Sequence, residues 1–183
     1  MSILETILNS GNGALVGQVA DSLELDKGKA GAAIAELLPA LNGGIRRNAE
    51  QPEGLGALMS ALQGGHHSDY VEKPDLLSRA ATITDGNAIL GHLLGSKDES
   101  RKVAAEAASR TGVDVGTLKK MLPMVAAMAM GSLSKESKGG GALSSLLAGG
   151  ASSAGAGLLS SFLDKDEGGS AVGNLLGMAR KFF

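Results

Sequence analysis

The chain has 183 residues, and its 17 Lys and Arg against 19 Asp and Glu give a formal net charge of −2. This near-neutral charge excludes a global field that would gather nucleic acid or anionic lipid. The absence of Cys excludes disulfides and thiol chemistry. The N-terminal MSILETILNSG lacks the basic flank and apolar run of a signal peptide, and the apolar stretch from Met121 to Met130 is shorter than the roughly 20 residues of a membrane span. We therefore expect a cytoplasmic protein with no membrane span.

Helical spacing of apolar residues predicts four helices in the first 65 residues. A capping box at residues 2–5 precedes a short first helix, and a second helix follows at once. Asp26 is expected to cap a long third helix, with a bend at Pro39 because proline removes a backbone hydrogen bond. Pro52 begins a fourth helix that ends at Gly64. The apolar residues of the second and third helices are Val16, Val19, Ala20 and Leu23, then Ala30, Ile34, Leu37, Leu38, Leu41 and Ile45.

The middle of the chain predicts a connection followed by a short helix. Residues 66–74 (HHSDYVEKP) have no apolar period and end in proline, which favours a polar loop between two halves. Asp85 or Asn87 then opens a short apolar helix, and Gly95 ends it.

Two more helices complete the second half. Ser96 and Glu99 form another capping box, for a helix over residues 97–110. Asp114 is expected to cap a long helix that again contains an internal proline. The residues that define this last helix are Leu118, Met121, Leu122, Pro123, Val125 and Met128.

Two parts of the chain share one order of features. Units of about residues 1–65 and 84–133 each have a short helix, an acidic cap and a long helix with a Leu-Pro step, at Pro39 and Pro123. We interpret them as a degenerate repeat, and the alternative is two helix pairs that are similar by chance. The sequence thus predicts an all-α fold: a compact helical domain over residues 1–133, made of two helix-turn-helix-like units with Pro-kinked long helices.

The last third changes in composition. Residues 134–169 are rich in Gly, Ser and Ala with short apolar islands, which indicates a linker. Residues 170–183 place apolar side chains on one helical face, which predicts a C-terminal amphipathic helix. Those side chains are Val172, Leu175, Leu176, Ala179, Phe182 and Phe183.

Three segments carry a family resemblance. They are GNAILGHLLG (86–95), the run ASRTGVDVGTLKKMLPMVAAMAMGSL that ends at Leu133, and the terminal GNLLGMARKFF (173–183). Together they resemble the bacterial domain-of-unknown-function 937 family, to which YidB-like proteins are related. The resemblance implies an all-helical protein, with homeodomain-like helix packing in the YidB-like relatives, and no established activity.

The helix pair around Gly112 is a candidate nucleic-acid contact, because its spacing resembles a helix-turn-helix. Its second helix would present Thr117, Lys119 and Lys120. It offers no Arg, Asn or Gln for bidentate contacts to base edges and soon becomes apolar, which favours a structural helix pair instead.

Sites for metals or catalysis are weak. His66, His67, Asp69 and Glu72 carry ligand atoms that suit a divalent ion, but adjacent histidines in a polar loop are more often solvated. His92 on its apolar helix is expected to be a core or interface histidine. The segment 164–170 starts like a calcium loop, yet position twelve is leucine instead of glutamate. We expect no metal, no cofactor, no small-molecule substrate and no catalytic residues.

The remaining indication of function in the sequence is its apolar helical surface. The Met/Ala-rich helix is apolar on several sides, which is typical either of core filling or of an adaptable binding face. If one small domain cannot cover it, self-association would. We therefore predict a non-enzymatic, homo-oligomeric interaction or structural protein, with a nucleic-acid-associated regulator as the alternative. The candidate self-association residues are Met124, Met128, Met130, Leu175, Leu176, Phe182 and Phe183.

Overall fold

The structure, a computed structural model, describes residue 7 and residues 13–64 and 66–138. The described part of the chain is helical and contains no strand, which confirms the predicted all-α class and the compact helical domain. Its elements are α2 (Ala14–Ser22), α3 (Lys27–Glu50), α4 (Pro52–Gly64), α5 (Asp69–Glu72), the 3₁₀ helix η2 (Pro74–Ser78), α6 (Ala80–Leu94), α7 (Lys97–Thr111) and α8 (Val115–Lys138). The predicted helix after residues 2–5, most of the linker and the predicted helix over 170–183 lie outside the described residues.

The helix starts that the sequence predicts from capping residues are confirmed. The Asp26 carboxylate accepts the backbone N–H of Gly28 at 2.8 Å and begins α3. Ser96 Oγ accepts the Glu99 N–H at 3.1 Å and begins α7. The Asp114 carboxylate accepts the Thr117 N–H at 3.1 Å in the first turn of α8. Such caps satisfy donors that the helix itself leaves open, so short sequence signals are sufficient to place them.

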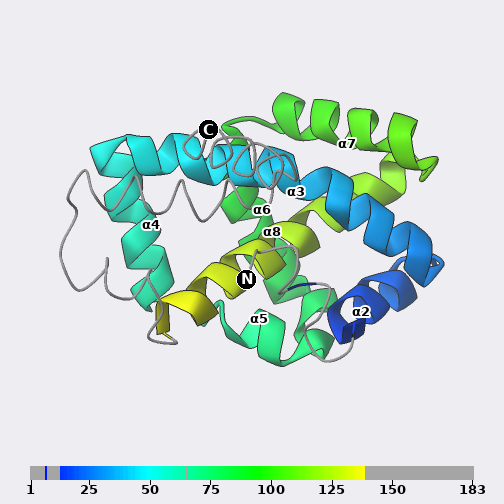
Figure 1. The fold of residues 1–183 in the computed structure, drawn as a ribbon, viewed down its shortest axis with the longest axis horizontal. Coiled ribbons are helices and arrows are strands. Elements are labelled where there is room, and N and C mark those ends of the chain that lie inside the picture. The colour runs from blue at the N-terminus through cyan, green and yellow to red at the C-terminus, as the bar shows by residue number, and fades with distance from the viewer. Residues whose placement is uncertain (1–6, 8–12, 65, 139–183) are drawn as a thin grey trace, which may run out of the picture.

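Helix α8 lies at the centre of the described domain. Figure 1 shows it crossing the middle of the molecule, with α3, α2, α5 and α4 around it and α6 crossing it. Residues 121–134 are all buried, including Pro123 and the methionines. Helix α6 packs along α8, while α3 and α7 pack against both. A helix with apolar side chains on all sides is stable in this position because neighbours cover every face.

Three boundaries differ from the sequence prediction. The expected polar connection contains α5 and η2, which bury Tyr70, Val71 and Leu77 against the core. Helix α6 begins at Ala80, several residues before Asp85 and without a side-chain cap, and the buried Thr82 of its first turn donates its hydroxyl to the Leu76 carbonyl at 2.7 Å. Helix α8 continues to Lys138, so the domain extends beyond residue 133 and into the predicted linker.

The two units are similar in outline only. Both α3 and α8 have 24 residues and follow a short helix and an aspartate. Both helices continue through their internal proline, but Pro39 is exposed on α3 and Pro123 is buried on α8. The duplication therefore stays a prediction. Across the described ranges, none of the helices has the length and hydrophobicity needed to cross a membrane.

Candidate functional sites

An apolar groove lies between α4 and α6. Its volume is about 130 Å³, and its floor is formed by α3 and α8. The rim is exposed at Ala57 and His92, whereas Leu58 and Leu93 are buried deeper in the walls. The lining residues are Asn48, Gly54, Ala57, Leu58, Ala61, Ile89, His92, Leu93 and Met130.

Helical spacing explains why these residues meet. Gly54, Ala57 and Ala61 recur at intervals of three and four, so they share one face of α4. Ile89 and Leu93 are four residues apart and form the facing wall on α6. Since three of the four α4 residues in the lining are Gly or Ala, the space between the two helices remains partly unfilled.

Polar side chains of α3 hold the α6 wall in place. Asn48 Nδ2 donates to the Gly44 carbonyl at 2.9 Å and to the His92 carbonyl at 3.0 Å. The Arg47 guanidinium donates to the Leu93 carbonyl at 3.4 Å. The His92 and Leu93 carbonyls belong to the last turn of α6, where a helix leaves its carbonyls without partners of its own. The groove is therefore built on helices that are fixed to one another by hydrogen bonds.

The groove is small and apolar. Its size is well below the roughly 300–1,000 Å³ of typical small-molecule sites. It is close to the ~150 Å³ apolar cavity that accommodates a benzene ring in another protein. The groove thus fits one or two apolar side chains better than a cofactor.

A second cavity carries basic side chains on a partly apolar lining. It has a volume of about 590 Å³ and lies where the C-terminus of α6 meets the N-termini of α7 and α8. Lys97, Arg101 and Lys119 line it, and Arg101 also pairs with Asp98 at 2.8 Å. The other lining residues are Asn87, Leu90, Gly91, Gly95, Ser96, Ser100 and Leu122.

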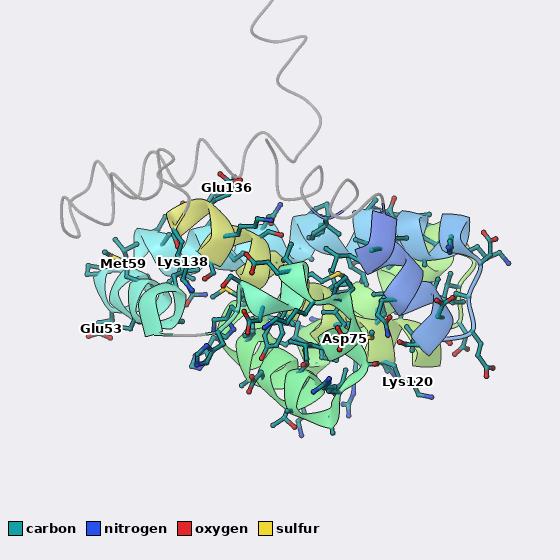
Figure 2. The ribbon with its side chains drawn as sticks, turned by 90° about the horizontal axis from the view of Figure 1, so that it is seen from below. Glu53, Met59, Asp75, Lys120, Glu136 and Lys138 are labelled. Carbon is teal, nitrogen blue, oxygen red and sulfur yellow. The ribbon has the colours of Figure 1, made fainter. Side chains whose placement is uncertain are left out.

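The predicted nucleic-acid residues are only partly brought together. Lys119 lines the basic cleft, whereas Lys120 is exposed beside it. The half-buried Thr117 is engaged through its backbone by the Asp114 cap. Figure 2 shows Lys120 at the opposite end of the molecule from Glu53 and Met59 of α4. The basic cleft and the apolar groove are therefore separate sites.

A third cluster joins the loop before α5 to α6. The Tyr70 hydroxyl donates to an Asp85 carboxylate oxygen at 2.5 Å, and the rings of His67 and Tyr70 are 5.8 Å apart between centroids. Burial, assisted by the bond to Asp85, raises the pKa of Tyr70 to about 12. Burial lowers the pKa of His67, against an opposing effect of Asp85, and Lys138 and His66 lower it further. The His67 Nδ1 atom is buried and has no hydrogen-bond partner within the described ranges.

The four residues weighed as metal ligands do not converge. Asp69 pairs with Lys73 at 3.4 Å, and His66 is exposed. Among the residues that the structure describes, no group of three or more His, Asp or Glu side chains is placed to hold a metal ion.

The candidate self-association residues fall into two sets. Met124, Met128 and Met130 are 2%, 0% and 3% exposed, so the single chain encloses them. This burial removes the surplus apolar surface that made these methionines candidates, and only Met130 reaches a cavity, at the groove floor. The second set, Leu175, Leu176, Phe182 and Phe183, lies outside the described residues.

Sequence reasoning missed the groove, although one of its members, His92, was expected at a core or interface position. The available signal was the helical spacing of Gly54, Ala57 and Ala61. It is weak because small residues in an Ala- and Gly-rich chain recur at such intervals by chance.

The comparisons with known proteins give a family and no activity. The model of a bacterial protein family of unknown function, DUF937, matches residues 5–136, more than two thirds of the chain. The chain therefore belongs to this family. No curated protein matches the chain. No solved structure matches it either.

Proposed function

We propose that this protein is a non-enzymatic interaction protein of the cytoplasm that self-associates, and that the groove between α4 and α6 is its contact surface. The observation that carries the proposal is the groove itself, whose walls are almost wholly apolar and whose rim is open at Ala57. Covering apolar surface of this kind removes it from water, which is favourable.

The chemistry of the chain supports a binding role over an enzymatic one. Cys is absent and the chain has only three His. Of these, His92 is on the groove rim, with no Ser, Thr or acidic residue among its neighbours in sequence, and His66 is exposed. Since Met124 and Met128 are enclosed, the contact is assigned to the groove and to the C-terminal residues Leu175, Leu176, Phe182 and Phe183 instead of the methionine helix.

Light scattering of the full chain over a range of concentrations tests self-association. The wild type should exceed the mass of one chain at high concentration, and Ala57→Glu should restore the mass of one chain. The glutamate side chain would occupy the mouth of the groove beside Leu58 and Ala61 and place a charge against its apolar lining, which is costly. Ala105→Glu is the matched control because Ala105 is exposed on α7, away from the groove. A wild type that remains monomeric at all concentrations would overturn the proposal.

A second candidate function is nucleic-acid binding at the basic cleft. The observation that favours it is the convergence of Lys97 and Arg101 of α7 with Lys119 of α8 in one cleft. Binding through such groups should weaken with salt, because phosphate contacts release counterions. A mobility shift lost in the Lys119→Glu, Lys120→Glu variant and retained in Lys135→Glu would support it. No binding at low salt would remove it.

A further inference from the structure

We infer that the groove between α4 and α6 binds residues 170–183 of a second copy of this chain, with the ring of Phe182 or Phe183 inserted between Ala61 and Ile89. This inference rests on the proposed self-association and names the segment that performs it. The proposed function assigns the contact to the groove and to the C-terminal residues, and the inference adds that these two parts bind each other.

The first argument is a match of shape. The groove volume of about 130 Å³ is suited to one aromatic ring, and its wall residues Leu58, Ile89 and Leu93 are apolar. The chain has no Trp, and its three Phe are Phe162, Phe182 and Phe183. All three follow Lys138, where α8 ends. In a contact between two copies, the rings free to enter the groove are therefore those of the C-terminal part, since Tyr70 is buried and bonded to Asp85.

The second argument is charge, which selects the terminal segment over Phe162. Glu50 and Glu53 are exposed at the end of the groove where α3 gives way to α4, close to Asn48 and Gly54. Arg180 and Lys181 directly precede Phe182, so their cations would approach these carboxylates. Phe162 is followed instead by Asp164, Asp166 and Glu167, which would be repelled. Arg47 at the same end is engaged with the Leu93 carbonyl.

The third argument is reach. Met130 on the groove floor precedes Lys138 by eight residues, or about 12 Å along the helix. The 31 residues from 139 to 169 separate Lys138 from the proposed segment, and a chain of 31 residues spans at most about 100 Å. A segment on such a tether can reach the groove of a neighbouring copy. Reciprocal exchange would give a closed two-fold dimer with both grooves filled.

Because the chain has no Trp, a single introduced tryptophan reports whether the C-terminal segment is buried. Copy one carries Ala57→Glu to close its own groove and Phe182→Trp as the only indole, or Phe183→Trp in a parallel sample. Copy two carries Phe182→Ala and Phe183→Ala, so its groove is open and its own tail lacks the anchor. Both are full-length chains, and circular dichroism and melting establish that they fold. If Ala57→Glu perturbs folding, Ala57→Gln replaces it.

The expected result is a shift of the tryptophan emission to shorter wavelength when copy two is added to copy one. The shift should saturate with increasing copy two. It should disappear when copy two also carries Ala57→Glu, and persist when it carries Ala105→Glu. Phe162→Trp in copy one should give no shift.

Each alternative outcome has its own reading. No shift on mixing with either reporter overturns the inference. A short-wavelength emission of Phe182→Trp in an otherwise wild-type monomer, without a shift on mixing, would place the segment in the groove of its own chain and also overturn it. Association by light scattering without any emission shift would overturn the inference and leave the proposed function standing. A chain that never exceeds one copy in mass would overturn the proposed function itself.

Discussion

Gly86 of α6 lies directly against the backbone of Pro123 in α8. A Cβ atom added to Gly86 would stand 2.1 Å from the Pro123 carbonyl oxygen, which is inside any permitted contact. The missing side chain therefore allows α6 to cross α8 at backbone contact distance. The groove depends on this crossing, since Ile89, His92 and Leu93 follow Gly86 on α6 while Met130 follows Pro123 on α8.

Substitution Gly86→Ala should lower the free energy of unfolding by about 1–3 kcal/mol, because both contacting groups are backbone and the helices must separate. Chemical denaturation measures the loss. Gly91→Ala is the matched control on the same helix: a Cβ there meets nothing within 4 Å. It should stabilise the protein by about 0.5–1 kcal/mol, as alanine usually does within a helix. Equal effects of the two variants would contradict a close α6–α8 crossing.

The contrast between local and tertiary signals explains what the sequence can predict. The starts of α3, α7 and α8 were predictable because Asp26, Ser96 and Asp114 act within a few residues of themselves. The start of α6 at Ala80 was not, since its first turn lacks a side-chain cap. The short helix around Tyr70 was missed because its stability comes from contacts with α6 and α8.

The groove could not be predicted from the sequence for the same reason. Its lining comes from four helices that are far apart in sequence, and each contributes an unremarkable set of small or aliphatic residues. The burial of Met128 could not be predicted from the sequence either. A helix that is apolar on all sides indicates either an interface or a central position, and only the arrangement of α3, α6 and α7 around it decides.

Removal of the Tyr70 hydroxyl should destabilise the domain in a pH-dependent manner. Tyr70→Phe deletes the bond to Asp85, which should cost about 1 kcal/mol near neutral pH. The raised pKa of Tyr70, about 12 against 10.0, means that the native state holds this proton more tightly. Its stabilising effect is therefore complete below pH 10 and is lost as the pH rises from there towards 12. Melting curves in alkaline buffers should show less of this loss in Tyr70→Phe than in the wild type.

His67 should make the domain sensitive to acid. Because burial lowers its pKa below 6.5, the native state favours the neutral ring. The resulting stability is present above pH 6.5 and is lost as the pH falls through the native pKa. His67→Gln should therefore reduce the fall in melting temperature between about pH 7 and about pH 5. The control is His92→Gln, because His92 is exposed on the groove rim. An unchanged acid response in His67→Gln would contradict this role.

Met128 distinguishes a core helix from an interface helix. The side chain is 0% exposed within the single chain, so Met128→Ala leaves a cavity and should lower the free energy of unfolding by about 2–5 kcal/mol. For a chain of this size, the melting temperature should fall by roughly 5–15 °C. Met59→Ala is the matched control, because Met59 is half-buried on α4 (Figure 2) and its truncation should cost less than about 1 kcal/mol. A Met128→Ala variant with unchanged melting but a lower mass in light scattering would instead place α8 at the contact between copies.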